Sequence, residues 1–371
     1  MIKFIPLENY YDVFIYFCLF LVLTNVIHAT SLDINNNKNI KFLRTSGWML
    51  LILVILFLGL RPISGRYFGD MGTYANYFKG YANGLPITID HDIAFHNYMK
   101  IVSNVVDAHG FFLITEVLYI VPTYLISKKY FKAYWFYGFL MFVVSFSFYT
   151  YGTNGIRNGL ATSMFLWGLC YPNKKLIMGV FFFIAAMFHK SLLLPVMAFV
   201  LTYVYNNPKF YIKAWCLAIP VSLVLGSVFI AIFTGLGFGD ERLAGYLSGE
   251  GQLDDAINTG FRWDFLFYSA FPVFAGWYFI FKKQFHDPFY NQVFNTYLIC
   301  NAFWILVIRA NFSNRFAYLS WFLMAFIIIY PLLKQQFFKN QQVMIAKVVA
   351  AYFMFTYLMY IIYYTILKTN Q

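Results

Sequence analysis

The stretch Tyr-Gly-Thr-Asn-Gly-Ile-Arg-Asn-Gly-Leu-Ala-Thr-Ser, residues 151–163, lies where one long apolar segment ends and the next begins. It places Asn154, Arg157 and Asn158 between two expected membrane helices. An arginine at that depth is costly in hydrocarbon, so its side chain is expected to face protein, water or an anion rather than lipid. The three glycines of the stretch keep the local surface low and let a bulky ligand approach the backbone. We therefore expect the functional site around this arginine.

Composition assigns the chain to a class. Its 371 residues are 61% hydrophobic and only 11% charged, with a mean hydropathy of +0.63. A soluble domain carries about 25% charged residues, so this chain has too few to cover a surface facing water. We predict an all-α polytopic membrane protein that forms a single membrane domain over residues 1–371. The net charge of +12 is expected to serve membrane topology, and no nucleic-acid partner is predicted.

A membrane-spanning helix needs about 20 mostly apolar residues. The pattern predicts about twelve such helices, with soft boundaries and several short members. They lie near residues 10–29, 46–60, 111–127, 134–150, 156–171, 176–189, 191–205, 214–236, 264–281, 289–308, 316–333 and 343–367.

Basic residues set the expected orientation. Alternate connections are rich in lysine and are expected on the cytoplasmic side. These lysines are Lys38, Lys41, Lys128, Lys129, Lys132, Lys174, Lys175, Lys209, Lys213, Lys282, Lys283, Lys334 and Lys339. Both termini and two larger loops, 61–110 and 237–263, are then expected on the outer face.

Arginines follow the opposite rule. Only Arg44 falls on the expected inner side, and the other seven fall on the outer side: Arg61, Arg66, Arg157, Arg242, Arg262, Arg309 and Arg315. The planar fork of arginine binds phosphate and carboxylate through paired hydrogen bonds. The asymmetry predicts a site for a large, multiply charged anion such as a pyrophosphate. The alternative is that some of these arginines pair with acidic residues of the outer loops.

Other polar groups of the outer segments extend the predicted site. The run Gly-Leu-Arg-Pro-Ile-Ser-Gly-Arg-Tyr-Phe-Gly-Asp-Met-Gly-Thr-Tyr, residues 59–74, adds Asp70 and Tyr74 to its two arginines. Asp70 is expected to orient an arginine or to accept a proton. Residues 93–106 predict an amphipathic helix, with an apolar stripe at Ala94, Tyr98, Ile101, Val102 and Val105.

Histidines and cysteines offer little metal-binding capacity. His91, Asp92 and His96 lie together, but no third ligand of matching spacing is evident, so no metal and no cofactor is predicted. Cys18, Cys170, Cys216 and Cys300 are scattered singly in apolar segments and are expected to be small buried hydrophobes.

His189 is the histidine with the most informative position. It lies in Phe-His-Lys-Ser, residues 188–191, at an expected outer turn level with Arg157. An imidazole there can take a proton from a sugar hydroxyl near neutral pH, whereas a structural role at a helix end is the alternative. Arg262 and Arg315 are expected at helix starts, where backbone N–H groups add donors for an anion.

The ordered set of motifs resembles the EpsG-like group of Wzy-type polysaccharide polymerases. The motifs are Gly-Leu-Arg…Gly-Asp…Tyr at 59–74, Asn-Gly-Ile-Arg-Asn-Gly-Leu-Ala at 154–161, Phe-His-Lys-Ser at 188–191, Phe-Arg-Trp-Asp-Phe at 261–265 and Asn-Arg-Phe-Ala-Tyr at 314–318. Two departures are Asn158, where the family often has glutamine, and His91-Asp92, where it often has glutamate.

The resemblance implies a GT-C-like glycosyltransferase in the bacterial plasma membrane, with its active site on the outer or periplasmic face. Such an enzyme polymerises undecaprenyl-pyrophosphate-linked repeat units into O-antigen, capsule or exopolysaccharide. The implied partners are the lipid-linked glycan donor and acceptor and membrane lipid, and a chain-length regulator protein is a further candidate. Arginines would replace a metal at the pyrophosphate, and direct displacement would invert the anomeric centre.

Roles for individual residues follow from this resemblance. Arg157 is assigned to the leaving pyrophosphate, His189 to the general base and Asp70 to the base as second choice. The supporting contacts are Arg61, Arg66, Tyr74, Asn154, Asn158, Ser191, Arg262, Arg309 and Arg315. The alternatives are a lipid-linked oligosaccharide flippase, which needs charge accessible from both faces and internal repeats, an O-antigen ligase, or a membrane acyltransferase.

Overall fold

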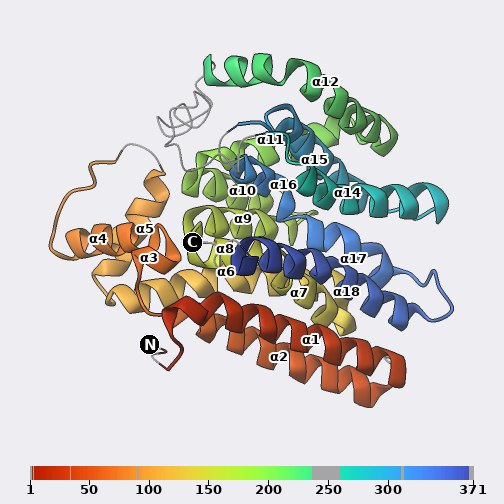
Figure 1. The fold of residues 1–371 in the computed structure, drawn as a ribbon, viewed down its shortest axis with the longest axis horizontal. Helices are drawn as coiled ribbons and strands as arrows, with labels where there is room; N and C mark the ends of the chain where they lie inside the picture. The colour runs from red at the N-terminus through yellow and green to blue at the C-terminus, as the bar shows by residue number, and fades with distance from the viewer. Residues whose placement is uncertain are drawn as a thin grey trace. The chain divides into compact units, whose positions relative to one another are not determined.

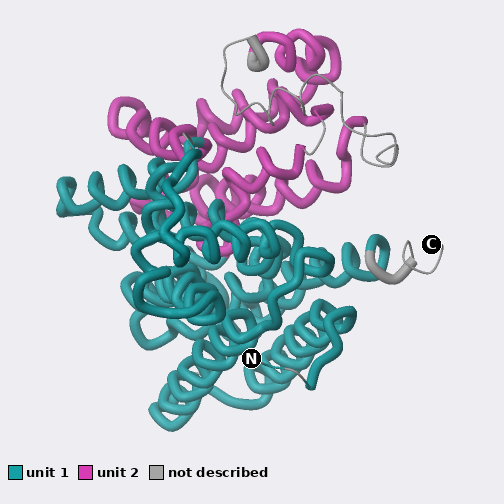
Figure 2. Tube along the Cα trace, turned by 90° about the vertical axis from the view of Figure 1, so that its left-hand side faces the viewer, with its two compact units in different colours: residues 1–190, 329–371 teal, residues 191–328 magenta. Residues whose placement is uncertain are grey.

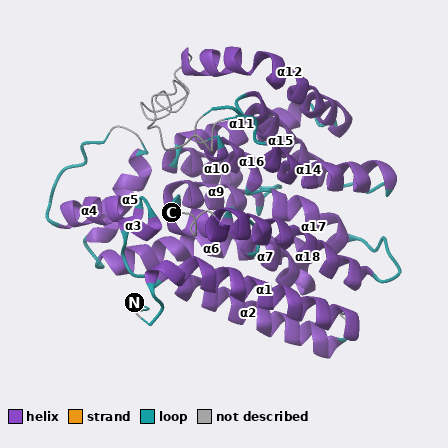
Figure 3. Ribbon diagram, viewed as in Figure 1, coloured by secondary structure: helices purple, strands orange, loops and turns teal. Residues whose placement is uncertain are grey.

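The computed structural model describes residues 2, 4–33, 35–89, 92–235, 260–310 and 313–366. Helices make up 81% of the protein, and the described residues form no strand (Figure 3). The described chain divides into two compact units, one of residues 1–190 with 329–371 and one of residues 191–328 (Figure 2). The prediction of an all-α fold is therefore confirmed.

The first unit contains most of the helices (Figure 1). They are α1 (Tyr10–Ser31), α2 (Asn37–Gly59), α3 (Gly65–Phe68), α4 (Met71–Ala82), α5 (Ile93–Ser103), α6 (Ala108–Phe131), α7 (Trp135–Val143), α8 (Phe148–Thr153), α9 (Ile156–Leu169), α10 (Lys175–Phe188) and α18 (Gln341–Met359). Within this unit α9 packs against α6 and α10, α2 packs against α6 and α7, and α1 packs against α18.

The second unit contains α11 (Leu193–Val204), α12 (Pro208–Gly235), α14 (Trp263–Trp277), α15 (Pro288–Leu306) and α16 (Asn314–Trp321). The helix α17 (Met324–Lys334) begins in the second unit and ends in the first. In the second unit α15 packs against α11, α12 and α16.

Local sequence explains where several helices begin. Asn36 accepts a hydrogen bond from the Lys38 N–H at 2.9 Å and caps α2, and Asp107 caps α6 through the Gly110 N–H at 2.8 Å. Asp287 accepts from two N–H groups of α15, and Pro288 stands at the first helical position. Such caps satisfy backbone donors that have no partner within the helix.

Among the described residues, seven helical segments are long and apolar enough to cross a membrane. They are Leu7–Ser31, Asn37–Gly59, Ala108–Val143, Pro208–Ile232, Trp263–Lys282, Asn314–Lys334 and Gln341–Tyr363. The chain is therefore a multi-pass membrane protein. Every predicted span contains a helix of the structure, but α7, α9, α10 and α11 have only 9, 14, 14 and 12 residues. The figure of about twelve spans stays a prediction.

Three of the connections in the first unit lie close together. Asp33 and Asn35 from the α1–α2 turn, Tyr134 from the α6–α7 turn, and residues of the α17–α18 turn that include Lys334 and Lys339 line a common cavity. The Tyr134 hydroxyl donates to Asn35 Oδ1 at 2.6 Å, which joins two of these turns directly. The cytoplasmic placement of the lysine-rich connections stays a prediction.

The predicted surface helix exists as α5, but it has two different faces. Phe95, His96 and Met99 are buried in the protein. Ile101 and Val105, from the stripe expected by helical spacing, remain 66% and 80% exposed. Tyr98 of the same stripe packs against Phe111 and Phe188, and its hydroxyl is 2.9 Å from Thr115 Oγ1. The stripe is therefore exposed at Ile101 and Val105 and covered by protein at Tyr98.

Two further expectations need comment. The second outer loop, 237–263, lies mostly outside the described residues, together with Arg242. Cys18, Cys170 and Cys300 are buried as expected, whereas Cys216 is exposed. The expectation for Cys216 was wrong because α12 turns much of its apolar surface outward, as a lipid-facing helix does.

Candidate functional site

The corner between α8 and α9 presents the central arginine. Asn154 and Gly155 both donate backbone hydrogen bonds to the Thr150 carbonyl, at 2.9 Å each, and end α8. α9 begins at once, so that Arg157 lies in its first turn. Gly159 allows this tight reversal, because a Cβ there would lie 2.7 Å from the Tyr151 carbonyl oxygen.

The stretch 59–74 is hydrogen-bonded to this corner. Asn154 Oδ1 accepts a hydrogen bond from the Asp70 N–H at 3.0 Å. Gly69, immediately before, has a φ of +51°, and a Cβ at this position would lie 2.2 Å from the same oxygen. Only glycine meets both requirements without displacement. Two motifs 84 residues apart in the sequence are thereby brought together.

Arg157 is enclosed by groups from two other segments, the start of α4 and the residue before α5. Its Nη1 forms an ion pair with Asp92 Oδ2, and its Cζ lies 5.8 Å from the centre of the Tyr74 ring. The Tyr74 hydroxyl also hydrogen-bonds the guanidinium, and Asp70 contributes a second negative charge nearby. The Arg157 side chain is still 13% exposed, so one part of it faces the outside of the protein.

Burial determines the state of Tyr74. It raises the pKa of the phenol to about 12, and the positive charge of Arg157 opposes this shift only in part. Tyr74 is therefore a neutral hydroxyl at any physiological pH, able to share a hydrogen bond with an arginine or with an oxyanion.

Asp92 is the functional residue that sequence reasoning failed to connect with Arg157. Its carboxylate is 2% exposed and also accepts a hydrogen bond from the Lys190 N–H at 3.4 Å, beside His189. No spacing rule links position 92 to positions 157 and 190. The only available signal was an acidic residue directly before an amphipathic helix.

The neighbouring histidine serves another purpose. His96 is 1% exposed, and its Nδ1 is 2.9 Å from the Tyr81 hydroxyl. His91 lies outside the described residues. Within the described part of the chain, no group of three or more histidine, cysteine and acidic residues lies close enough to hold a metal ion.

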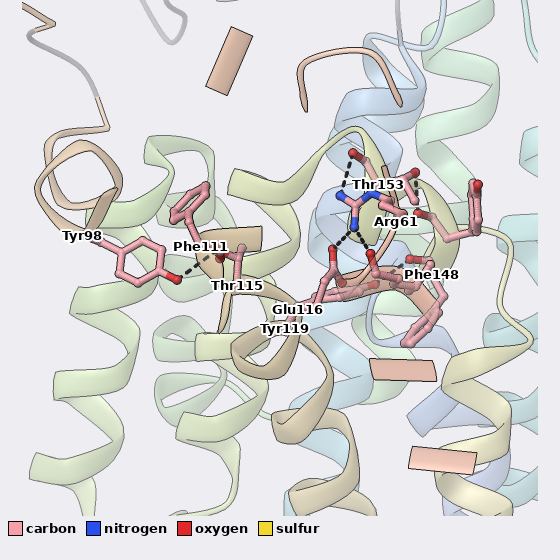
Figure 4. A network of polar contacts seen from close by, with 10 residues as sticks. Arg61, Tyr98, Phe111, Thr115, Glu116, Tyr119, Phe148 and Thr153 are labelled. Atoms are coloured by element: carbon pink, nitrogen blue, oxygen red, sulfur yellow. Dashed lines mark hydrogen bonds and ion pairs between the residues drawn. The ribbon is translucent and has the colours of Figure 1, made fainter. Parts of the chain in front are cut away.

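Arg61 lies inside the fold rather than at a ligand surface. Its side chain is 0% exposed and its Nη1 donates to Glu116 Oε1 at 2.8 Å (Figure 4). The same guanidinium binds the carbonyl of Leu58 at the end of α2 and the carbonyl of Thr153 at the end of α8, the latter at 3.3 Å. The expected contact with pyrophosphate therefore has no exposed atom to make it in this structure.

Arg61 instead joins three helices beneath the site. Figure 4 shows its guanidinium between Thr153 and Glu116, with the Tyr119 hydroxyl donating to the Phe148 carbonyl at 2.9 Å beside it. Since Thr153 directly precedes Asn154, this buried pair supports the corner that carries Arg157. Glu116 was not among the residues predicted from the sequence.

The remaining predicted residues of the first unit lie around Arg157 with differing exposure. Asp70 and Asn158 are half-buried, and Arg66 is exposed on α3, with its Cζ 5.5 Å from the Tyr67 ring. His189 is half-buried at the C-terminal end of α10, next to the residue whose N–H binds Asp92. Arg157 Nε and Asn158 Oδ1 are buried and have no hydrogen-bond partner within the described residues.

The second unit carries the other four predicted residues, namely Ser191, Arg262, Arg309 and Arg315. Arg262 forms a two-pronged ion pair with Asp264, at 3.0 and 2.7 Å, and lies 3.7 Å from the centre of the Phe265 ring. This is the pairing with an outer acid that was considered as the alternative. Arg309 is exposed and reaches the Leu223 carbonyl at 3.4 Å, and Arg315 is exposed on α16.

The helical fold of the described residues and their apolar helices define a multi-pass membrane protein, with a partly exposed arginine at a helix corner. The comparison with protein families agrees and is more specific: the model of the EpsG family matches residues 47–371. The chain therefore belongs to the EpsG family, whose members are Wzy-like, polysaccharide polymerase-type membrane proteins. No curated protein and no solved structure matches the chain.

Proposed function

We propose that this protein is a Wzy-type polymerase that joins undecaprenyl-pyrophosphate-linked oligosaccharide repeat units on the outer face of the bacterial plasma membrane. The proposal includes about twelve membrane helices in a GT-C-like arrangement. The observation that carries it is Arg157, an arginine whose side chain is 13% exposed and held at a helix corner in a chain of this family.

The proposed reaction is a direct displacement. The bond between the anomeric carbon of the growing chain and its pyrophosphate carrier breaks, and a bond to the acceptor hydroxyl oxygen forms, with inversion. Negative charge develops on the departing pyrophosphate, and a cation already in place lowers the barrier because it needs no rearrangement at that moment. Arg157 is assigned this role, and Tyr74 adds a neutral hydroxyl donor beside it.

The acceptor hydroxyl loses its proton as the new bond forms. His189 is the first candidate for the base, because an imidazole has an unperturbed pKa near 6.5 and this one lies beside the Lys190 N–H that binds Asp92. Asp70 is the second candidate, since it lies half-buried close to Arg157 and Tyr74. Asp92 is excluded by geometry, because its carboxylate is enclosed and already bound on both oxygens.

The test is a gel of surface polysaccharide from a deletion strain that ligates its glycan to lipid A core. Complementation with Arg157→Ala is expected to abolish the ladder of long chains and retain the single-repeat band. Arg157→Lys keeps the charge without the planar fork and is expected to give a shortened ladder. Lys339→Ala, an exposed residue in the α17–α18 turn, is the matched control and is expected to give the wild-type ladder.

Each gel pattern discriminates between functions. Loss of the single-repeat band as well would indicate a flippase or a ligase, since export or attachment would then have failed. An intact ladder with Arg157→Ala would refute the assignment of Arg157. His189→Ala with near-normal polymer would remove His189 as the base and leave Asp70.

A further inference from the structure

Asp92 has an unusual position for a residue before a helix. It has φ 49° and ψ 40°, in the left-handed region, and stands at the N-cap position of α5. Aspartate at an N-cap usually accepts a hydrogen bond from the first turn of the helix. The Asp92 side chain makes no such bond. Its carboxylate binds Arg157 and the Lys190 N–H instead.

The carboxylate is buried more deeply than the arginine that it binds. The Asp92 side chain is 2% exposed, whereas the Arg157 side chain is 13% exposed. Asp92 is therefore enclosed by protein, while Arg157 is partly accessible from outside. A negative charge fixed beside a cation weakens the attraction that the cation exerts on an anion. Burial makes this effect stronger, because little water screens it.

In the proposed reaction, the negative charge of Asp92 would help the product to leave. A half-buried arginine without a partner would hold pyrophosphate tightly, both before and after transfer. The lipid pyrophosphate must leave after every transfer, so that excessive affinity slows turnover. An arginine balanced by a fixed carboxylate still stabilises developing charge and releases the product more readily.

We propose that Asp92 is a positioning residue that sets the affinity of Arg157 for the departing pyrophosphate group. The inference rests on the proposed function, since it concerns the same site. Asp92 fixes the side chain of Arg157 and offsets part of its charge, and it touches neither substrate nor product.

The test measures binding of inorganic pyrophosphate to the full-length protein in lipid nanodiscs by calorimetry. Asp92→Asn keeps the size of the side chain and tolerates the left-handed backbone, while it removes the charge. We expect about tenfold tighter binding in this variant, since a neighbouring like charge that opposed the anion is lost. Inhibition of polymerisation by added inorganic pyrophosphate, which mimics the head group of the departing carrier, should become stronger by the same factor.

Two controls isolate the effect. Asp107→Asn removes an equal charge at the N-cap of α6, where asparagine also caps, and should leave pyrophosphate affinity unchanged. In an Arg157→Ala background, Asp92→Asn should have no effect, because Asp92 acts through Arg157. If Asp92→Asn does not fold, Asp92→Gly also accepts the positive φ and takes its place.

The outcomes separate the inference from the proposed function. Wild-type protein that binds pyrophosphate and polymerises, together with unchanged or weaker binding in Asp92→Asn, overturns the inference alone. Wild-type protein that binds no pyrophosphate overturns both.

Discussion

The buried pair of Arg61 and Glu116 provides the sharpest test of how the site is supported. Both side chains are almost inaccessible, 0% and 1% exposed, and their closest atoms are 2.8 Å apart. Arg61→Met leaves the Glu116 carboxylate buried without a counter-charge, and Glu116→Leu does the same to the guanidinium. Removing one partner of a buried ion pair costs about 3–5 kcal/mol.

The double variant Arg61→Met/Glu116→Leu separates support from ligand binding. Replacing a buried pair by apolar residues of similar size is often neutral or stabilises by about 1–4 kcal/mol, since no charge remains to be desolvated. We therefore expect each single variant to lose stability. Two carbonyl groups, of Leu58 and Thr153, lose their donor in Arg61→Met and in the double variant alike, at about 1–3 kcal/mol for each. The double variant should therefore recover the part of the loss that the unpaired Glu116 carboxylate causes in Arg61→Met, and it should stay less stable than the wild-type protein.

The assay is thermal unfolding in detergent, followed by size-exclusion chromatography, together with the polysaccharide gel. A loss of 1 kcal/mol in stability lowers Tm by about 2 °C, so the Tm of each single variant should fall by about 6–10 °C. Arg66→Met is the matched control, because Arg66 is an exposed arginine on the next helix and its loss should cost little. A stable double variant that makes no polymer would refute the reasoning, since Arg61 would then be needed for the reaction itself.

Two further substitutions test the contacts around the corner. Placing an alanine in the left-handed region of the backbone costs roughly 1–2 kcal/mol. Gly69→Ala should destabilise the protein by more than this, because the new Cβ also meets Asn154. Gly84→Ala, with a φ of +85° and no neighbouring atom within 4 Å, should show the backbone cost alone in the same unfolding assay. Tyr74→Phe should reduce the polymer ladder and lower the stability of the protein by about 1.5–3 kcal/mol, because it removes a hydrogen bond to the charged Arg157. Tyr77→Phe, one turn along α4, should leave both the ladder and the stability near those of the wild-type protein.

Hydrophobic pattern and charge predicted the class and the helices because both properties are local. A membrane helix can be recognised from a run of about 20 consecutive, mostly apolar residues. This property alone predicts α1, α2, α6, α12 and α18. The glycine-flanked corner at 151–163 could equally be predicted from the sequence, since glycine and arginine are unusual next to hydrocarbon. The stretch 59–74 was predicted to belong to the same site, and the structure shows the contact that holds it there, a hydrogen bond to the Asn154 side chain.

Pairing between residues that are distant in the sequence could not be predicted from it. Arg61 and Arg157 look equivalent in the sequence, each beside glycines and each at an outer helix end. Nothing local distinguishes the arginine that meets Glu116, 55 residues away, from the one that meets Asp92, 65 residues away. The buried face of α5 was missed for a similar reason, because helical spacing finds an apolar stripe but does not say whether protein or lipid covers it.

Three arginines that pair with a carboxylate show that pairing alone does not assign a role. Arg61, Arg157 and Arg262 are each bound to an acid, yet their side chains are 0%, 13% and 13% exposed. Arg262 pairs with Asp264, which is itself 33% exposed, so a solvated anion competes there with a solvated carboxylate. Arg157 differs from both, since its partner is buried while the arginine is partly exposed. A partly exposed cation with a buried counter-charge suits the transient binding of pyrophosphate that we propose. That asymmetry, rather than the number of arginines expected on the outer face, is the reason to propose the chemistry at Arg157.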